Sequence, residues 1–250
     1  MARVPGTLDR LIFWLSHPQA PYVEILHTMG IRHLLLDLEH GAFDLGALDP
    51  FLALTRALGF TVLCKTVSPT TEAIQQALDF GADGVVVPHL GGVAHAREVL
   101  AAGKFPPRGV RSYSGGRSAG YTRATGSYFA DTDRRVRTLA MIETAGSLAE
   151  VEAIAALDTV DGLFPGPSDL ALARGRGAYA FGDADRADLV RVARAAAAAG
   201  KPWIMPAWTP PERLFGEAEG AERMVVASQH GVVRAGVSAT LESLRKDGII

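Results

Sequence analysis

The sequence has little of several things that mark specialised classes of protein. Its only cysteine, Cys64, excludes an internal disulfide and lies in an apolar run that is typical of a buried thiol. The net charge is only −2, which excludes the basic surface of a nucleic-acid-binding protein. No apolar run approaches membrane-spanning length, and Leu11–Leu15 is too short for the core of a signal peptide. We expect a cytoplasmic protein with small-molecule partners and neither nucleic acid nor membrane as a partner.

The sequence has enough apolar residues for a sizeable hydrophobic core. Apolar residues make up 48% of the chain and charged residues 21%, as in an ordinary globular protein. A length of 250 residues is typical of one α/β barrel. We therefore expect a single domain over residues 1–250.

Short apolar runs, many of them β-branched, alternate with longer amphipathic stretches, which is the pattern of repeated βα units. There are eight such runs, the number that closes a (β/α)₈ TIM barrel. The predicted strands are Leu11–Ser16, His33–Leu38, Thr61–Thr66, Gly84–Pro88, Arg137–Ile142, Gly162–Pro165, Pro202–Pro206 and Met224–Ala227.

Helices are expected between these strands, and Gly81 and Gly200 stand where two of them should end. The stretch from Phe105 to about Arg135 is predicted to be irregular, because it is rich in proline, glycine and arginine. So long a connection indicates a lid, a binding loop or a subunit contact, or else a mobile surface loop. The clearest predicted helices are Leu45–Leu58, Thr71–Phe80, Ala94–Ala102, Leu148–Leu157 and Ala184–Ala199.

Titratable residues gather where the predicted strands end, which is where barrel enzymes place their catalytic groups. Glu143 and Asp169 follow adjacent strands and are close enough to share Mg²⁺ or Mn²⁺ with open positions left for a substrate. Either carboxylate alone would suit a helix cap or a salt bridge. A cation there would polarise the carbonyl of a 2-oxo acid and stabilise its enolate.

His40 has the basicity to move a proton near neutral pH, although Asp37 or Glu39 could be the important member of the same cluster. Lys65, inside an apolar strand, needs a counter-charge or a task, and could stabilise an enolate oxygen or form a Schiff base. Backbone amides of Ser168 and Asp169 would suit a substrate carboxylate. The other six histidines are interpreted as structural, least securely the one that ends strand four: His17, His27, His33, His89, His95 and His230.

Five segments, in order and spacing over nearly the whole chain, resemble the metal-dependent class II pyruvate aldolases of the HpcH/HpaI family. The resemblance implies a TIM barrel of the phosphoenolpyruvate/pyruvate-binding type that uses Mg²⁺, Mn²⁺ or Co²⁺ and forms a homo-oligomer, a trimer or hexamer. It implies metal ligands at Glu143 and Asp169 and a general base at His40. The segments are Leu36–Gly41, Ala82–Pro88, Phe105–Arg111, Ile142–Thr144 and Val160–Leu170.

The resemblance also implies that an aspartate supports this histidine, at the position of Asp79. A residue at the end of the helix before strand four should lie at the opposite end of its own barrel from His40. We therefore expect Asp79 to act across a subunit interface, or else to be a simple helix-end residue.

Two positions depart from the family pattern, with Lys65 in place of an arginine and Met141 in place of a glutamine. The first keeps the charge but loses a two-pronged contact, and the second removes an amide donor. The leading hypothesis is an aldolase that cleaves 4-hydroxy-2-oxo acids to pyruvate, or a similar 2-oxo acid, and an aldehyde, and catalyses the reverse addition. Alternatives are a 2-oxo acid decarboxylase, a Schiff-base aldolase using Lys65, and a non-catalytic metabolite-binding barrel.

Overall fold

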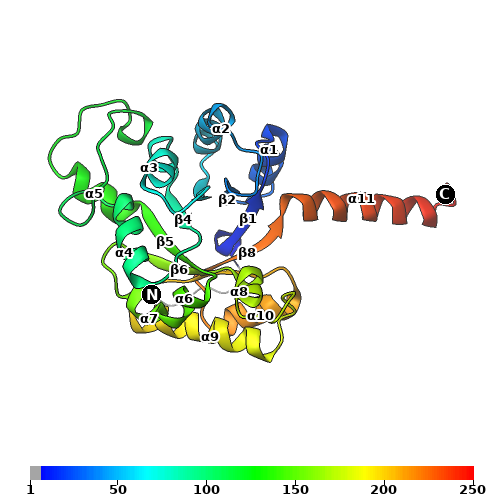
Figure 1. The fold of residues 1–250 in the computed structure, drawn as a ribbon. Helices are drawn as coiled ribbons and strands as arrows, with labels where there is room; N and C mark the ends of the chain where they lie inside the picture. Colours follow the sequence, from blue (N-terminus) through cyan, green and yellow to red (C-terminus); the bar gives the residue numbers. More distant parts are fainter. Residues whose placement is uncertain (1–6) are drawn as a thin grey trace.

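The computed structural model describes residues 7–250, so the predicted start of the domain at residue 1 lies outside the described residues. Eight parallel strands wind into a barrel with helices around it (Figure 1). All eight lie where the sequence predicted strands, with ends that differ by at most two residues. They are β1 Leu11–Leu15, β2 His33–Asp37, β3 Thr61–Lys65, β4 Gly84–Val87, β5 Arg137–Ile142, β6 Gly162–Pro165, β7 Ile204–Pro206 and β8 Arg223–Ser228.

The strands are hydrogen-bonded in the order β6-β5-β4-β3-β2-β1-β8-β7. A parallel bridge between Leu163 and Trp203, with the Leu163 amide donating to the carbonyl of Pro202 at 3.1 Å, joins β6 to β7. This bridge closes the ring. The predicted TIM-barrel fold is confirmed.

Two cores hold the barrel together. The larger one fills the layer between the strands and the surrounding helices, and includes Leu36, Cys64 and Val87. The smaller one fills the interior of the barrel, where Leu35, Leu63, Val86 and other inward residues meet. Alternate residues of each strand therefore serve the two cores, which explains why the strands are apolar on both faces.

The helices begin and end at the signals that the sequence carries. Asp44 and Thr70 cap α2 and α3 by accepting backbone N–H bonds, and Gly81 and Gly200 follow α3 and α9 with φ of 105° and 65°. The helices are α1 Ala20–Thr28, α2 Leu45–Ala57, α3 Thr71–Asp79, α4 Val93–Leu100, α5 Tyr128–Arg135, α6 Ala145–Ala149, α7 Val151–Ala155, α8 Pro167–Ala173, α9 Asp183–Ala198, α10 Pro210–Ala218 and α11 Gln229–Lys246, with 3₁₀ turns at Leu8–Arg10, Ala101–Gly103 and Arg117–Ala119.

Two predictions need correction. The expected helix Leu148–Leu157 is interrupted at Glu150, where α6 ends and α7 begins. The stretch from Phe105 to Arg135 is irregular only as far as Ser127, because Tyr128–Arg135 forms α5. Rings of Tyr113, Tyr128 and Phe129 pack edge to face there at centroid distances of 5.3–5.8 Å, so this helix is held by aromatic packing rather than by a long apolar stripe.

The last helix, α11, does not lie against the barrel. It projects away from the strands as a single arm (Figure 1), and Gln229 at its start is its only buried residue. Val233 and Val237 on this arm are 53% and 55% exposed. No helix within residues 7–250 is long and apolar enough to span a membrane.

Candidate active site

The carboxyl ends of the strands carry the polar side chains of the barrel interior. The inward positions of β2 and β3 end in Asp37 and Lys65, which are paired in register. Continuing the inward alternation of β5 beyond Met141 reaches Glu143, and that of β6 beyond Phe164 reaches Gly166. Strand register therefore brings these positions to one end of the barrel.

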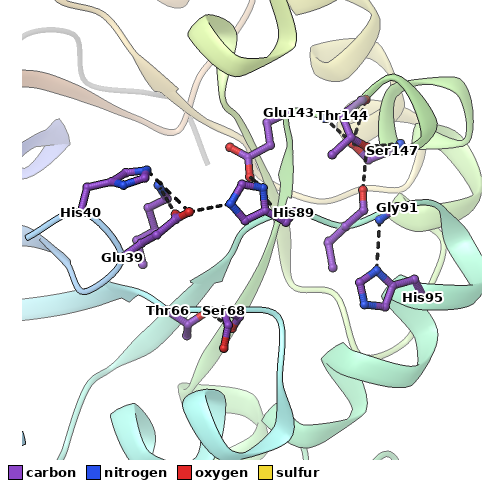
Figure 2. A network of polar contacts seen from close by, with 12 residues as sticks. Glu39, His40, Thr66, Ser68, His89, Gly91, His95, Glu143, Thr144 and Ser147 are labelled. Atoms are coloured by element: carbon purple, nitrogen blue, oxygen red, sulfur yellow. Dashed lines mark hydrogen bonds and ion pairs between the residues drawn. The ribbon is translucent and has the colours of Figure 1, made fainter. Parts of the chain in front are cut away.

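Glu39 contacts both His40 and His89 in the polar network of Figure 2, and Lys65 is its ion-pair partner. Lys65 is 3% exposed, and its Nζ lies 2.5 Å from Oε2 of Glu39. Burial raises the pKa of Glu39, but hydrogen bonds from Lys65 and His89 outweigh it and hold that pKa below its usual range. The buried lysine thus has the counter-charge that its position in an apolar strand required.

His89 joins the two carboxylates Glu39 and Glu143 (Figure 2). Its Nε2 lies 2.5 Å from Oε1 of Glu39, and its Nδ1 lies 3.4 Å from Oε1 of Glu143. Its backbone φ of 55° is left-handed, a conformation that residues other than glycine adopt rarely. The turn after β4 therefore directs the ring of His89 into the site. From the sequence this histidine was interpreted as structural.

Glu143 is almost fully buried, at 2% exposure. Its Oε1 accepts the backbone N–H of His89 at 2.7 Å, while its Oε2 has no hydrogen-bond partner among the described residues. Burial raises the pKa of Glu143, and the negative charge of Asp169 adds to the rise against the opposing effects of His89 and Lys65. One oxygen of a buried carboxylate is thus left without protein ligands.

Gly166 makes room for this carboxylate. A Cβ at that position would lie 2.7 Å from Oε2 of Glu143 and 2.8 Å from the terminal methyl of Met141. Any side chain would therefore displace Glu143, so glycine is required where the chain leaves β6.

His40 lies in the turn after β2, with its side chain 67% exposed. The carboxylate of Asp37 accepts the backbone N–H of His40 at 3.1 Å and the indole N–H of Trp14 at 3.1 Å. Gly41 then passes close to Ser16, since a Cβ there would lie 2.7 Å from the Ser16 carbonyl oxygen. The backbone that carries His40 is fixed, while its imidazole faces the opening of the barrel.

Ser168 and Asp169 lie in the first turn of α8, directly after Gly166 and Pro167. The first N–H groups of a helix have no acceptor within the helix. Both residues line a cavity of about 150 Å³ at the mouth of the barrel, together with His40 and Lys65. The structure thus gathers five of the six residues singled out from the sequence in or beside this cavity: His40, Lys65, Glu143, Ser168 and Asp169.

Asp79 is the exception. It is the last residue of α3, and its Oδ1 accepts a hydrogen bond from Nη2 of Arg111 at 3.0 Å. Because α3 leads into β4, Asp79 lies at the amino end of the strands, opposite the mouth. Its side chain is 27% exposed, so a second molecule could reach it.

The mouth fits a divalent cation. Within residues 7–250 no group of three or more His, Cys, Asp or Glu side chains is arranged to hold a metal. The two carboxylates to be considered at the mouth are those of Glu143 and Asp169. Oε2 of Glu143 lacks a protein partner, and Asp169 is near enough to raise the pKa of Glu143. Hard carboxylate oxygens with positions left for water and substrate suit Mg²⁺ and related ions.

Comparison with known proteins agrees with the fold and identifies the family. The model of the HpcH/HpaI aldolase/citrate lyase family matches residues 10–231. The chain belongs to this family. The aldolase names of its relatives make it a carbon–carbon lyase, as the sequence predicted.

Three curated relatives illustrate the range of the family. A 4-hydroxy-2-oxovalerate aldolase of Novosphingobium aromaticivorans is 35% identical over 66% of this chain, and the alignment spans 63% of that relative, less than two thirds of it. A hydroxypyruvate/pyruvate aldolase of Rhizorhabdus wittichii is 32% identical over 75% of each chain. A 5-keto-4-deoxy-D-glucarate aldolase of Shigella dysenteriae is 29% identical over 93% of this chain and 90% of that protein.

Solved structures support the fold. The HpcH/HpaI aldolase of Desulfitobacterium hafniense has a TM-score of 0.86 at 18% identity, over 95% of this chain and 93% of that one. The CitE protein of Mycobacterium tuberculosis, solved in complex with magnesium and acetate, has a TM-score of 0.59 at 16% identity, over 88% and 85% of the two chains.

Proposed function

We propose that the chain is a metal-dependent aldolase that cleaves 4-hydroxy-2-oxo acids to pyruvate, or a similar 2-oxo acid, and an aldehyde, and catalyses the reverse addition. The observation that carries the proposal is Oε2 of Glu143, a buried carboxylate oxygen without a protein partner beside Asp169. A single barrel domain over residues 1–250 would be the catalytic unit. A cytoplasmic location remains a proposal that rests on the single buried Cys64.

Glu143 and Asp169 would hold the cation, with Mg²⁺ or Mn²⁺ favoured and Co²⁺ as a further candidate. When bound, the cation supplies positive charge that polarises the ketone of a 2-oxo acid. The N–H groups of Ser168 and Asp169 in the first turn of α8 would orient the carboxylate of the substrate.

His40 would move the proton. In cleavage its imidazole accepts the proton of the C4 hydroxyl as the C3–C4 bond breaks, and the electron pair of that bond passes to the enolate. Asp37 fixes the backbone of His40, and Oε1 of Glu39 lies 3.5 Å from its Nε2. Because the side chain of His40 is 67% exposed, its imidazole can exchange the proton with solvent between turnovers.

Lys65 would stabilise the negative charge that develops on the enolate oxygen. Its contact with Glu39 at 2.5 Å suits an ammonium group, whereas a Schiff base requires the free amine. This contact favours the electrostatic role over the Schiff-base aldolase.

A homo-oligomer, a trimer or a hexamer, is part of the proposal. The arm α11 exposes Val233, Val237 and Leu241. The barrel exposes Met29, directly after α1, and Leu214 on α10, at 68% and 73%. A second copy of the chain is the partner that would cover both sets of exposed apolar residues. Each copy supplies one α11 arm and one pair of exposed barrel residues, Met29 and Leu214. Asp79 would then support His40 of a neighbouring subunit, in competition with Arg111 of its own chain.

The proposal is tested by pyruvate release from 4-hydroxy-2-oxopentanoate. Release should require added Mg²⁺ or Mn²⁺, stop after chelation, and fall by roughly 10³-fold or more in Asp169→Asn. Undiminished release by the chelated protein would contradict it, and sodium borohydride would then trap a Lys65 adduct if an imine forms.

A further inference from the structure

The cavity at the mouth of the barrel has two chemically distinct halves. One half carries the polar groups His40, Lys65, Ser168 and Asp169, which the proposed function assigns to the 2-oxo acid and to proton transfer. The other half carries no hydrogen-bonding side chain except the indole N–H groups. This apolar half is lined by Trp14, Met141, Phe164, Pro206 and Trp208.

The floor of the apolar half is closed to water. Phe164 is 0% exposed and Met141 is 3% exposed, and both belong to the core inside the barrel. A hydroxyl or carboxylate of a substrate placed against them would lose its hydrogen bonds to water without gaining a strong donor or acceptor. This floor therefore disfavours a polar substituent.

Two tryptophans form the wall. The ring of Trp208 packs edge to face on Trp14 at a centroid distance of 6.2 Å, and Trp14 lies 6.3 Å from Phe164. The N–H of Trp14 donates to Asp37 at 3.1 Å, and Nζ of Lys65 lies 5.9 Å from the centre of its ring, so the indole is held in one orientation beside the polar groups.

Trp208 is held in place although 38% of its surface is exposed. The next residue, Thr209, begins α10, and its N–H and hydroxyl both donate to Glu212 at 2.7 Å. A capped helix start directly after the ring limits its movement. A large apolar side chain that is fixed, exposed and turned into a cavity is ready to bind an apolar group.

We propose that this apolar half selects aldol substrates in which C4 carries a compact apolar group, such as a phenyl ring or a branched alkyl chain. The cavity of about 150 Å³ must hold the 2-oxo acid as well, so the group on C4 has to be compact. The acceptor in the reverse reaction is then an aromatic or branched aldehyde. The inference rests on the proposed function, because the polar half must hold the 2-oxo acid.

The reaction is that of an aldolase. Cleavage breaks the C3–C4 bond, the C4 hydroxyl loses its proton and becomes the aldehyde oxygen, and C3 gains one proton to become the methyl group of pyruvate. No oxidant or reductant is needed.

The test measures kcat/KM for the addition of pyruvate to four aldehydes: benzaldehyde, 2-methylpropanal, glyceraldehyde and glyoxylate. The wild-type protein should prefer benzaldehyde over glyceraldehyde by about 10-fold or more, as expected for burying a ring of this size. Trp208→Ala should lower this preference by about 10-fold, and Trp208→Phe should retain most of it. Met141→Gln should reduce this preference, because it should raise kcat/KM for the polar aldehydes.

Leu172→Ala is the control, because Leu172 is an exposed apolar residue on α8 that does not line the cavity. It should leave the preference unchanged. Equal or better use of glyceraldehyde and glyoxylate by the wild-type protein would overturn the inference, as would a Trp208→Ala variant that loses all four activities in equal proportion.

Deuterium exchange into the methyl group of pyruvate, measured without any aldehyde, separates the two proposals. Exchange together with a preference for polar aldehydes, or with no addition to any of the four, overturns only the inference. The absence of both exchange and addition overturns the proposed function and the inference with it.

Discussion

The two ends of the barrel each contain a buried lysine, but the surroundings of the two differ. At the base, Lys104 is 0% exposed and its Nζ contacts Asp161 at 2.5 Å and the carbonyls of Asp133 and Val136 at 2.8 and 2.7 Å. These contacts use all three of its N–H donors. At the mouth, Lys65 lies 2.5 Å from Glu39 and has the ring of Trp14 at 5.9 Å, so it keeps donors for a ligand.

The two ends of the barrel also differ in how other buried charges are paired. The cavity at the base, about 240 Å³ in volume, is larger than the one at the mouth and is lined by Arg137 and Arg223. Both arginines contact Glu222, at 2.5 and 2.9 Å. At the mouth, Oε2 of Glu143 has no such partner. The candidate site therefore differs from the ion-pair network of Arg137, Arg223 and Glu222 in having a buried carboxylate oxygen without a partner, and not in the size of its cavity.

Replacing Lys65 gives the largest effect expected from this comparison. Lys65→Met should lower kcat/KM for aldol cleavage by about 10²- to 10³-fold, because it removes a donor to the developing enolate charge. Steady-state kinetics with thermal unfolding as a check on folding measures this. A variant that unfolds at lower temperature yet cleaves at the wild-type rate would assign Lys65 a structural role.

Lys104→Met should act on stability instead. It leaves the carboxylate of Asp161 and two buried carbonyls without their cation, at a cost of about 3 kcal/mol in the free energy of unfolding. Urea denaturation measures the loss, and kcat per folded molecule should not change. A loss of kcat in fully folded Lys104→Met would end the distinction between the two lysines.

His89→Leu should weaken the binding of Mn²⁺ by about 10-fold, since partners that orient metal-ligating groups typically contribute 10- to 100-fold to affinity. The ring of His89 lies between Glu39 and Glu143, and its removal takes one partner from each carboxylate. His95→Leu is the control, because His95 is on α4 close by and accepts only the N–H of Gly91. Calorimetric titration of both variants with Mn²⁺ shows whether the loss of affinity depends on the contacts of the histidine with Glu39 and Glu143.

The smallest effect concerns pH and the base of the barrel. Burial, followed by the charge of Arg223, lowers the pKa of His33 from 6.5 to about 4. Between these values the unfolded chain binds the proton more readily than the folded one, so the folded protein loses stability as pH falls from 6.5 to 4. His33→Asn should reduce this loss by on the order of 1 kcal/mol in urea unfolding curves at the two pH values. An unchanged pH dependence would show that other groups carry it.

The strands could be predicted because each is short, apolar and followed by an amphipathic stretch. The interruption at Glu150 and the helix Tyr128–Arg135 could not, because both depend on packing between segments rather than on local pattern. Aromatic contacts of Tyr128 and Phe129 supply stability that a period of apolar residues does not reveal.

For the site, position at a strand end predicted Lys65, Glu143 and Asp169, which the structure places in or beside the cavity at the mouth. The role of His89 was missed, since its left-handed turn reverses the direction that strand alternation implies. A Pro-His pair at the end of β4 was the available signal. The contact of Trp208 with Trp14 was also missed, because it forms only when β8 pairs with both β7 and β1 and so brings the two tryptophans together.

The central claim, enolate chemistry at Glu143, is tested most directly by deuterium incorporation into the methyl group of pyruvate. The wild-type protein with Mg²⁺ or Mn²⁺ should catalyse exchange, and both chelation and Glu143→Gln should abolish it. Exchange that continues without metal, or at the wild-type rate in Glu143→Gln, would contradict the claim.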